Sequence, residues 1–316
     1  MRFDRVAVTG GSGRLGRFVV DELSRHTRVT VLDIAPGPSS TSPSSTSLAP
    51  HRHIAVDILD LDGIYRALEG HDAVVHLAAI DAAVETTPKR YFETNVEGSF
   101  NILQAAHDRG ISKLVMASSV AAFGFGGDNP DHPPRYLPID EAHPLNPNGA
   151  YGLSKQVGEV VARGFAIRGV TQIACLRPTL IIRHEVVGEV DNLARLEAGD
   201  PSGIMNFDLS GIAEPFGEAL PAMRSYVMPE DVARCFRRAL EVDFGAFDIF
   251  NVAARDTIGP IDSLAALESE LGYLPEVRDP ERYAADPTAS LIDSRHARDI
   301  LGWEAPRTWP EIVSKQ

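Results

Sequence analysis

Short apolar runs alternate with longer amphipathic stretches over the first 180 residues. The runs are rich in β-branched residues and almost continuously hydrophobic, which is typical of strands that are buried on both faces of a parallel sheet. We expect these strands at Arg5–Thr9, Arg28–Asp33, His53–Asp57, Ala73–Leu77, Lys113–Ala117 and Gln172–Leu176. Between most of them a helical period predicts helices at Leu15–Arg25, Leu61–Glu69, Tyr91–Arg109 and Tyr151–Ile167. This alternation predicts a doubly wound α/β fold.

The alternation ends after Pro178. Beyond it we expect a strand at Ala246–Val252 and helices at Asp191–Ala198, Pro229–Glu241, Ile261–Leu271 and Ser294–Leu301. Residues 1–178 are therefore predicted to form the sheet domain. Residues 179–316 are expected to form mainly a smaller, irregular C-terminal lobe that binds the substrate, with some segments returning to the sheet. Residues 36–47 consist only of Pro, Gly, Ser and Thr, which favours a surface loop, either a tolerated insertion or a lid.

Charge and composition exclude several classes of protein. The chain has 316 residues, with 44 acidic and 30 basic side chains and a formal net charge of −14. This charge argues against a general nucleic-acid binder, because such binding depends on neutralising phosphates. No apolar run is long enough to predict a membrane helix, and the strand-like run from Arg5 leaves no room for a signal peptide. Only two cysteines, Cys175 and Cys235, are present, which favours a cytoplasmic location.

A glycine-rich turn, TGGSGRLG at residues 9–16, joins the first strand to the first helix. Gly10, Gly13 and Gly16 are spaced three apart, but Gly11 also fits as the first glycine, so the register stays open. Such a turn lets backbone N–H groups and the positive end of a helix dipole bind a pyrophosphate. It therefore predicts a Rossmann-type dinucleotide site.

Asp33 ends the second strand, seventeen positions after Gly16. A carboxylate there accepts hydrogen bonds from the ribose hydroxyls of an adenosine and repels a 2′-phosphate. We therefore expect NAD rather than NADP, a preference that Arg14 would weaken.

Tyr151 and Lys155 lie four residues apart at the start of a predicted helix, so they share one face. A tyrosine with the reference pKa of about 10 is a poor base at neutral pH. A nearby ammonium stabilises the phenolate and lowers that pKa. Ser119 follows the fifth strand, where its hydroxyl would hold a substrate oxygen beside Tyr151. Together the three residues predict acid–base catalysis on an alcohol.

With these motifs the sequence resembles the extended short-chain dehydrogenase/reductase family, in the branch of NAD-dependent nucleotide-sugar epimerases and dehydratases. The glycine turn resembles the TGxxGxxG motif of that family, VVHLAA its fourth strand, NVEG its N-x-x-G motif, and SSVAAFG its SSxxVYG motif. YGLSK resembles its Y-x-x-x-K motif, and RSYVMPEDVA and LGWEAPRTW resemble two motifs of its C-terminal half. The resemblance covers nearly the whole chain.

The resemblance implies roles for the matching residues. The catalytic residues are Ser119, Tyr151 and Lys155, of which Tyr151 and Lys155 also contact the cofactor. The other implied cofactor-binding residues are Gly10, Gly13, Arg14, Leu15, Gly16, Asp33, Asp57, Ile58, Leu77, Ala78, Ala79 and Asn95. Ser119 and Arg224 are expected to bind the substrate, with Arg224 at a diphosphate, and helices like Tyr91–Arg109 form a homodimer interface in this family. Arg177 is a further candidate for a substrate anion or for an ordinary salt bridge.

Departures from the family pattern limit which reactions and substrates of the family are expected. Val120 and Ala121 stand where dehydratases carry an acidic pair, which argues against dehydration. The sixth strand reads LRPTLII, and residues 201–223 lack the family's sugar-nucleotide motif, so the presence of a nucleotide on the substrate stays open. The ten histidines show no metal-binding spacing, and we expect no metal site.

We predict an NAD-dependent enzyme that oxidises a secondary alcohol of a sugar or nucleotide sugar, with an epimerase as the first choice. The alternative is a dehydrogenase of a free sugar, a uronate or another small alcohol. A third hypothesis is a non-catalytic NAD-sensing protein, and Tyr151 and Lys155 argue against it.

Overall fold

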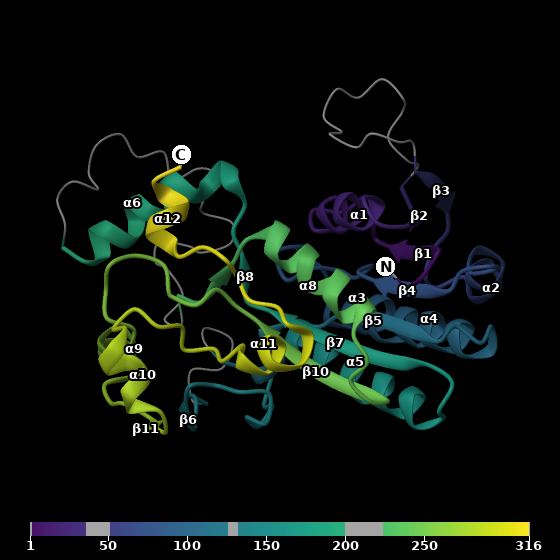
Figure 1. The fold of residues 1–316 in the computed structure, drawn as a ribbon. Coiled ribbons are helices and arrows are strands. Elements are labelled where there is room, and N and C mark those ends of the chain that lie inside the picture. The colour runs from purple at the N-terminus through teal and green to yellow at the C-terminus, as the bar shows by residue number, and fades with distance from the viewer. Residues whose placement is uncertain (1, 36–50, 126–131, 200–223, 316) are drawn as a thin grey trace.

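The computed structural model describes residues 2–35, 51–125, 132–199 and 224–315, so the segments 36–47 and 201–223 discussed above lie outside the described residues. A seven-stranded parallel sheet in the order β10-β7-β5-β4-β1-β2-β3 forms its centre (Figure 1). Its strands are β1 (Arg5–Thr9), β2 (Arg28–Asp33), β3 (Arg52–Ala55), β4 (Ala73–His76), β5 (Lys113–Ala117), β7 (Gln172–Pro178) and β10 (Phe247–Val252). The strand order reverses between β1 and β4, at the point where α/β proteins bind ligands. The predicted doubly wound sheet is confirmed.

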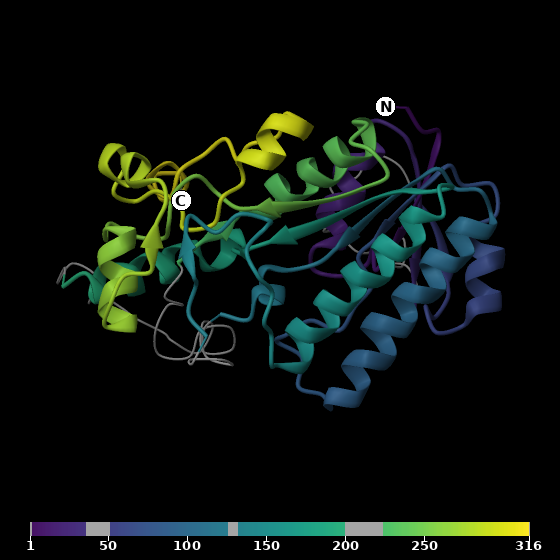
Figure 2. The same ribbon diagram turned by 90° about the horizontal axis from the view of Figure 1, so that it is seen from below.

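Helices cover both faces of the sheet (Figure 2). One face carries α2 (Leu61–Ala67), α4 (Gly98–Asp108) and α5 (Ala150–Ile167), and the other carries α1 (Gly16–Ser24), α8 (Pro229–Glu241) and α11 (Arg295–Leu301). Successive side chains of a strand point to opposite faces. In β1, Val6 and Val8 accordingly belong to the apolar core on the α1 side, and Ala7 belongs to the core on the α5 side. Burial on both sides explains why the strand is apolar at each of these positions.

The predicted helix Tyr91–Arg109 is divided in the structure. α3 (Pro88–Tyr91) leads into a π-helical segment (Phe92–Glu97), and α4 follows it. Asn95 lies in the π-helical segment and uses its amide outside the helix, on Ile80 and Ser154. An apolar period does not distinguish a π-helical turn from an α-helical one, so the sequence predicted one continuous helix.

The segments after Pro178 are divided between the sheet and a separate lobe. β10 pairs with β7, and α8 packs against α1, so both belong to the sheet layers. The lobe has two short parallel ladders, β6 (Tyr136–Leu137) with β11 (Glu276–Val277) and β8 (Leu180–Ile181) with β9 (Tyr226–Val227). Its helices are α6 (Val187–Glu197), α9 (Ser263–Leu271), α10 (Pro280–Ala285) and α12 (Trp309–Val313). The strand arrows of the sheet point toward this lobe, so it stands over the carboxyl edge (Figure 2).

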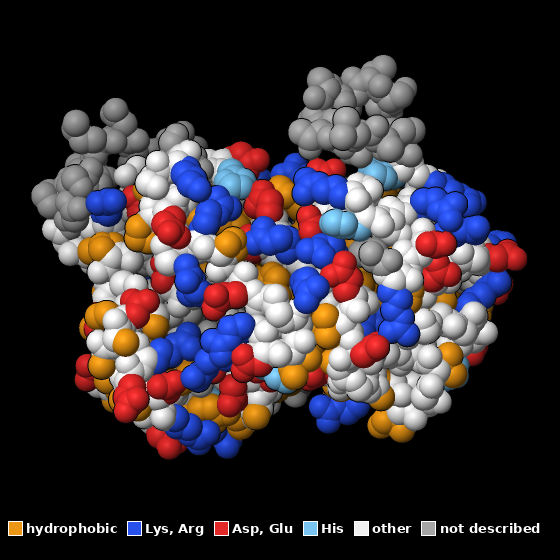
Figure 3. Space-filling view, in the orientation of Figure 1, with side chains coloured by type: hydrophobic (Ala, Val, Ile, Leu, Met, Phe, Trp, Pro, Cys, Tyr) orange, Lys and Arg blue, Asp and Glu red, His pale blue; other side chains and the backbone are white. Residues whose placement is uncertain are grey.

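Acidic and basic side chains are interspersed over the face of the molecule drawn in Figure 3. Within the described ranges, no helix is long and apolar enough to cross a membrane. The same residues contain no group of three or more His, Cys, Asp or Glu side chains placed to hold a metal ion.

Candidate functional site

The turn between β1 and α1 passes very close to the end of β4. Gly10 has a φ of +68°, and a Cβ on it would lie 2.7 Å from the backbone nitrogen of Ala78. A Cβ on Gly16 would lie 2.1 Å from the carbonyl oxygen of Gly10, whereas the Gly13 N–H donates to that oxygen at 3.0 Å. Gly10 is therefore the first glycine of the turn, in a left-handed conformation that favours glycine. Arg14 and Leu15 follow Gly13 directly before α1 begins.

The two predicted adenosine-binding carboxylates follow neighbouring strands, with Asp33 at the end of β2 and Asp57 two residues after β3. Asp33 accepts the Ser12 N–H of the glycine turn through Oδ2 at 3.0 Å, so it is fixed against that turn. Asp57 is exposed and accepts the Leu59 N–H at 2.9 Å. Ile58 is only 6% exposed, and its side chain packs in the core on the α5 side, next to Asp57 in the chain.

A directional chain of hydrogen bonds joins the end of β1 to that of β4 and to α4. The Thr9 hydroxyl accepts the N–H groups of Leu77 and Ala78 at 3.2 Å, so its own proton goes to Nδ1 of His76 at 2.7 Å. Nε2 of His76 then donates to the Ser99 hydroxyl at 2.9 Å. Burial and the nearby Lys155 charge lower the pKa of His76 to about 3, so the imidazole stays neutral. The chain fixes Leu77 and Ala78 beside Gly10, and Ala79 follows them in an exposed position.

Ser119, Tyr151 and Lys155 meet at the carboxyl end of β5. Tyr151 lies in the first turn of α5, and Lys155 lies one turn further on. The Ser119 hydroxyl interacts with the Tyr151 phenol and lowers its pKa, and the Lys155 Nζ lies 5.6 Å from the centroid of the Tyr151 ring. Lys155 Nζ also donates to the Ala117 carbonyl oxygen at 3.0 Å, which holds it over the end of β5.

The close packing of α5 explains how Tyr151 reaches Ser119. Ser119 caps a 3₁₀ turn (Val120–Phe123) by accepting the Ala121 N–H at 3.1 Å. A Cβ on Gly152 would lie 2.5 Å from the Ala121 carbonyl oxygen, so only a glycine lets α5 approach this turn. The three residues that the sequence linked by motif are thus brought together by one helix contact.

The pKa of Tyr151 differs from the expectation that Lys155 lowers it. Burial raises the pKa of Tyr151 above its ordinary value, and the negative charge of Asp81 raises it further, while Ser119 lowers it. Burial lowers the pKa of Lys155 to about 8, although Asp81 and Glu159 oppose this effect. Lys155 therefore titrates closest to neutrality in this pair, and Tyr151 is held as a protonated phenol. The net shift of the Tyr151 pKa is upward, because burial and Asp81 outweigh the lowering by Ser119.

Sequence reasoning missed Asp81, which lies next to this pair. Its Oδ2 pairs with Nη2 of Arg14 at 2.9 Å, and its backbone carbonyl accepts the Tyr91 hydroxyl at 3.3 Å. The Tyr91 ring lies edge-on to Tyr151 with centroids 5.9 Å apart. The sequence did contain a signal for Asp81. Like Asp33 at the end of β2, Asp81 comes after a buried strand, and a carboxylate at the carboxyl edge of a parallel sheet faces the ligand site.

Asn95 is not placed as the resemblance implied. Its side chain is 3% exposed, its Oδ1 accepts the Ile80 N–H at 2.7 Å, and its Nδ2 donates to the Ile80 carbonyl and to Ser154 Oγ, both at 3.0 Å. Ser154 in turn donates to the Tyr151 carbonyl at 2.7 Å. Asn95 is therefore a positioning residue that ties the loop after β4 to the start of α5.

Arg177, a candidate for binding a substrate anion, is instead part of a buried ion pair. It is 2% exposed and makes a bidentate contact with Glu159, at 2.8 and 2.7 Å. Ser118 donates to the same carboxylate at 2.6 Å, and the guanidinium lies 4.8 Å from the centroid of the Phe123 ring. Of the two roles considered for Arg177, the salt bridge is the one that the structure shows. The guanidinium is buried against Glu159, Ser118 and Phe123, which leaves no face of it for a substrate.

Arg224 lies in the lobe, two residues before β9. It is 8% exposed with a φ of +41°, and its Nη2 pairs with the carboxylate of Glu197 at the end of α6. Its Nη1 is buried without a hydrogen-bond partner among the described residues. Its backbone carbonyl accepts the Ile258 N–H at 3.0 Å, which sets it beside Gly259.

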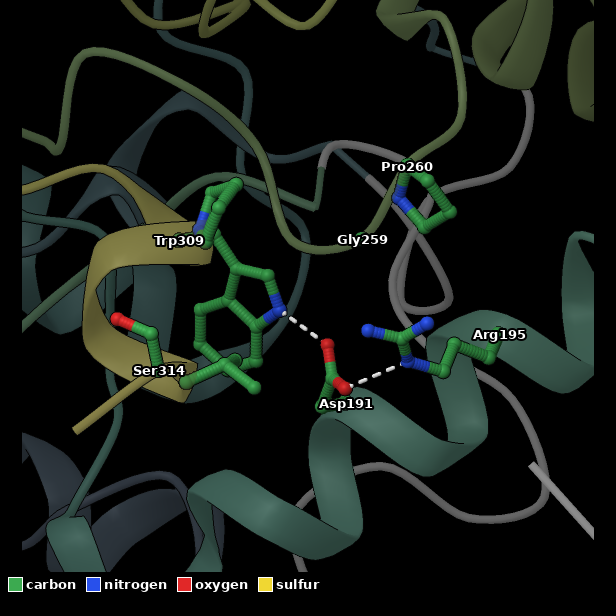
Figure 4. A pocket seen from close by; sticks show the side chains of 8 residues that line it. Asp191, Arg195, Gly259, Pro260, Trp309 and Ser314 are labelled. Atoms are coloured by element: carbon green, nitrogen blue, oxygen red, sulfur yellow. Dashed lines mark hydrogen bonds and ion pairs between the residues drawn. The ribbon is translucent and has the colours of Figure 1, made fainter. Parts of the chain in front are cut away.

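A cavity of about 310 Å³ lies in the lobe between α6 and α12 (Figure 4). Asp191 sits at its wall, accepting the Trp309 indole N–H and the Arg195 Nε–H, both at 2.8 Å. Its lining includes none of the predicted cofactor or catalytic residues. The chemistry predicted from the sequence therefore belongs to the carboxyl edge of the sheet and not to this cavity.

The geometry of the carboxyl edge fits a dinucleotide. Gly10 and Gly16 let the turn pack tightly against the end of β4 and against itself, at the N-terminus of α1, where helix N–H groups favour a phosphate. Asp33 lies on the β2 side of this turn, where an adenosine ribose would be bound. Tyr151 and Lys155 lie on the β5 side, where the reactive ring would face the phenol. The residues present thus match both ends of NAD across the switch point of the sheet.

Comparisons with known proteins agree with this geometry. The profile described as "NAD dependent epimerase/dehydratase family" matches residues 6–253. A UDP-glucose 4-epimerase of Lactobacillus helveticus is 28% identical, over 95% of this chain and 92% of that protein. A uronate dehydrogenase of Pseudomonas syringae pv. tomato is 30% identical over 51% of this chain and 53% of its own length.

Solved structures share the fold. A short-chain dehydrogenase/reductase superfamily protein from Agrobacterium tumefaciens with bound NAD superposes with a TM-score of 0.69, at 24% identity over 98% of this chain and 95% of that one. Because the family profile covers most of the sequence, the chain belongs to the NAD-dependent epimerase/dehydratase family and has NAD as its cofactor.

Proposed function

We propose that this chain oxidises a secondary alcohol of a sugar and is an epimerase. The observation that supports this most is the grouping of Ser119, Tyr151 and Lys155 on the edge of the sheet that the glycine turn also faces, with Lys155 Nζ 5.6 Å from the centroid of the Tyr151 ring. In this proposal the lobe formed mainly by residues 179–316 holds the substrate over that edge. NAD, when bound, supplies the acceptor for the hydride that leaves the alcohol carbon.

The residues of the chain have separate tasks in this reaction. Ser119 holds the substrate oxygen, and Tyr151 exchanges a proton with that oxygen at its phenolic hydroxyl. In the oxidation the substrate hydroxyl gives its proton to the Tyr151 phenolate, and in the return step the phenol gives that proton back to the alkoxide oxygen. The raised pKa of Tyr151 makes its phenolate a strong base for the first of these transfers. Lys155, with a pKa of about 8, supplies the positive charge that stabilises the phenolate when Tyr151 takes up its basic form.

Return of the hydride distinguishes the two candidate activities. An epimerase returns it to the opposite face of the transient ketone, whereas a dehydrogenase releases the ketone and NADH. The relative named as an epimerase matches along nearly its whole length, while the likeness to the uronate dehydrogenase is confined to about half of each chain. This difference favours the epimerase. The dehydrogenase is the second candidate, supported by the 30% identity to the uronate dehydrogenase over that half.

Retention of NAD by the purified protein tests whether it is an epimerase or a dehydrogenase. An epimerase should keep NAD through dialysis and convert a sugar to its epimer with none added. Accumulation of one NADH per sugar converted would contradict the epimerase and support the dehydrogenase.

We further propose a cytoplasmic homodimer. Its support is a group of exposed apolar side chains on α4 and α5: Phe100 at 41%, Val160 at 66% and Ile167 at 78% exposure. Both cysteines are buried free thiols, in keeping with a reducing compartment. Val160→Asp should dissociate the dimer in sedimentation experiments, and the matched change Ile300→Asp on α11 should not. A monomeric wild-type chain would overturn this proposal.

A further inference from the structure

Helix α5 carries a third polar side chain in line with the reacting pair. Tyr151, Lys155 and Glu159 follow one another at intervals of four residues, which places them on one side of the helix. Lys155 Nζ donates to the Ala117 carbonyl oxygen at 3.0 Å, and Glu159 Oε1 accepts the Ser118 hydroxyl at 2.6 Å. The side of α5 that carries the reacting groups therefore also holds the end of β5.

Ser118 is fixed from two directions, directly before Ser119. Its N–H donates to the Leu176 carbonyl oxygen of β7 at 2.7 Å, and its hydroxyl donates to Glu159. Ser118 and Glu159 are both buried, so water does not compete for this hydrogen bond. A hydrogen bond to an ionised carboxylate is stronger than one between neutral groups. It fixes the backbone from which the Ser119 side chain extends.

Glu159 is itself held by Arg177 of β7, the strand next to β5. Nε and Nη2 of Arg177 donate to the two carboxylate oxygens, at 2.8 and 2.7 Å, which gives the carboxylate a single orientation. Nη1 of Arg177 donates to the Glu141 carbonyl oxygen at 3.3 Å and so fixes the guanidinium as well. Because the pair is buried and bidentate, it presents Oε1 to Ser118 at a constant position.

We propose that Glu159 is a positioning residue of the reaction, which sets the place of Ser119 through the hydroxyl of Ser118. This inference rests on the proposed function, because Ser119 is the residue that holds the substrate oxygen there. That oxygen must lie within reach of both Ser119 and Tyr151, and a displacement of about 1 Å at such a group can cost about a hundredfold in rate. The buried ion pair thus contributes to turnover as well as to stability.

Ser118→Ala tests this inference, because it removes the hydrogen bond and leaves the Arg177–Glu159 pair in place. We expect kcat to fall about ten- to hundredfold, while the dissociation constant of NAD stays as in the wild type. The substrates tried are UDP-glucose and glucuronate, and the one that the wild type oxidises is used for every variant. A wild-type kcat in Ser118→Ala would overturn the inference.

Thr171→Val is the matched control. It removes a buried hydroxyl that donates to the Ile111 carbonyl oxygen at 2.8 Å, directly before β7 begins and so at the opposite edge of the sheet. Its kcat should equal that of the wild type. An equal loss of kcat in Thr171→Val and Ser118→Ala would show a general effect of losing a buried hydroxyl and would overturn the inference.

A double variant, Glu159→Leu with Arg177→Met, removes the acceptor instead of the donor and leaves neither charge of the pair behind. Its kcat should fall as far as that of Ser118→Ala. Adding Ser118→Ala to it should cost no further activity, because the same hydrogen bond is already lost, whereas independent defects would add. A folded double variant with wild-type kcat, or losses that add, would contradict the role of Glu159.

Crystal structures of the wild type and of Ser118→Ala separate this inference from the proposed function. In the variant we expect Oγ of Ser119 to move away from the phenolic oxygen of Tyr151. An unmoved Ser119 would overturn the inference. A wild-type chain that oxidises no sugar would overturn the proposed oxidation instead, and the two structures would still decide whether Glu159 positions Ser119.

Discussion

Arg14 and Asp81 form an ion pair, with 2.9 Å between Nη2 and Oδ2, that links the glycine turn to the loop after β4. Both side chains are more than half exposed, so the pair itself contributes at most about 1 kcal/mol to stability. Its importance lies in its position, because the Asp81 charge raises the pKa of both Tyr151 and Lys155. The pair therefore connects the cofactor turn to the acid–base group.

Asp81→Asn should move the pH dependence of the reaction toward lower pH. Removing a negative charge favours the deprotonated phenolate and the neutral amine, so the pKa of Tyr151 and that of Lys155 should both fall. The pH profile of kcat/KM measures this change. Arg14→Gln breaks the same ion pair but keeps the carboxylate, so its profile should not move to lower pH. Equal profiles for Asp81→Asn and the wild type would show that Asp81 does not act on the reacting group.

Gly10→Ala should abolish measurable NAD binding and destabilise the fold. The methyl group would meet the Ala78 backbone at 2.7 Å, in addition to the cost of about 1 kcal/mol for a left-handed alanine. Gly110→Ala is a matched control, because Gly110 has a φ of +69° with no atom within 4 Å of the added Cβ. Thermal melting and NAD titration of both variants separate the clash from the backbone strain. A Gly10→Ala chain that binds NAD normally would place the cofactor elsewhere.

Asp33→Asn should reduce the preference for NAD over NADP. The variant loses a charge-assisted hydrogen bond to the ribose, which is worth about 1.5–3 kcal/mol, or roughly ten- to hundredfold in affinity. It also removes the charge that repels a 2′-phosphate. The ratio of kcat/KM values for the two cofactors gives the result. An unchanged ratio would mean that Asp33 only holds the Ser12 N–H.

Arg177→Met should lower the free energy of unfolding by about 3–5 kcal/mol, because it leaves Glu159 buried without its partner. The double variant Glu159→Gln with Arg177→Met should recover part of this loss. Denaturant titrations of the two single variants and the double variant measure the coupling. A large rise in KM for the sugar, with stability unchanged, would instead assign Arg177 to the substrate.

The sequence predicted the parts of the molecule that depend on local pattern. Strands β1, β2 and β5 have the predicted bounds because each is buried on both faces and ends at a polar turn. Ser119, Tyr151 and Lys155 were predicted from their order and spacing, because Ser119 follows the end of one strand and the other two share one face of one helix. Short elements such as β8 and α12 were missed. A strand of two residues and a helix of five are both too short to show a hydrophobic period.

Side-chain pairs between residues that are distant in the chain could not be predicted from the sequence. Glu159 lies eighteen residues before Arg177, and their pairing depends on how α5 packs against β7. The Arg224–Glu197 pair depends likewise on how α6 packs in the lobe, so the motif predicted a phosphate ligand where the structure has a carboxylate. The raised pKa of Tyr151 follows from burial and from Asp81, neither of which the four-residue spacing to Lys155 reveals.

Tyr151→Phe, compared with Tyr273→Phe at an exposed site on the lobe, tests the central claim most directly. The two variants remove the same hydroxyl from different places, and both should fold and bind NAD as the wild type does. Oxidation of the sugar should fall at least about a thousandfold in Tyr151→Phe, within the range expected for loss of a general acid–base group, and should be unchanged in Tyr273→Phe. Wild-type turnover by Tyr151→Phe would contradict the account.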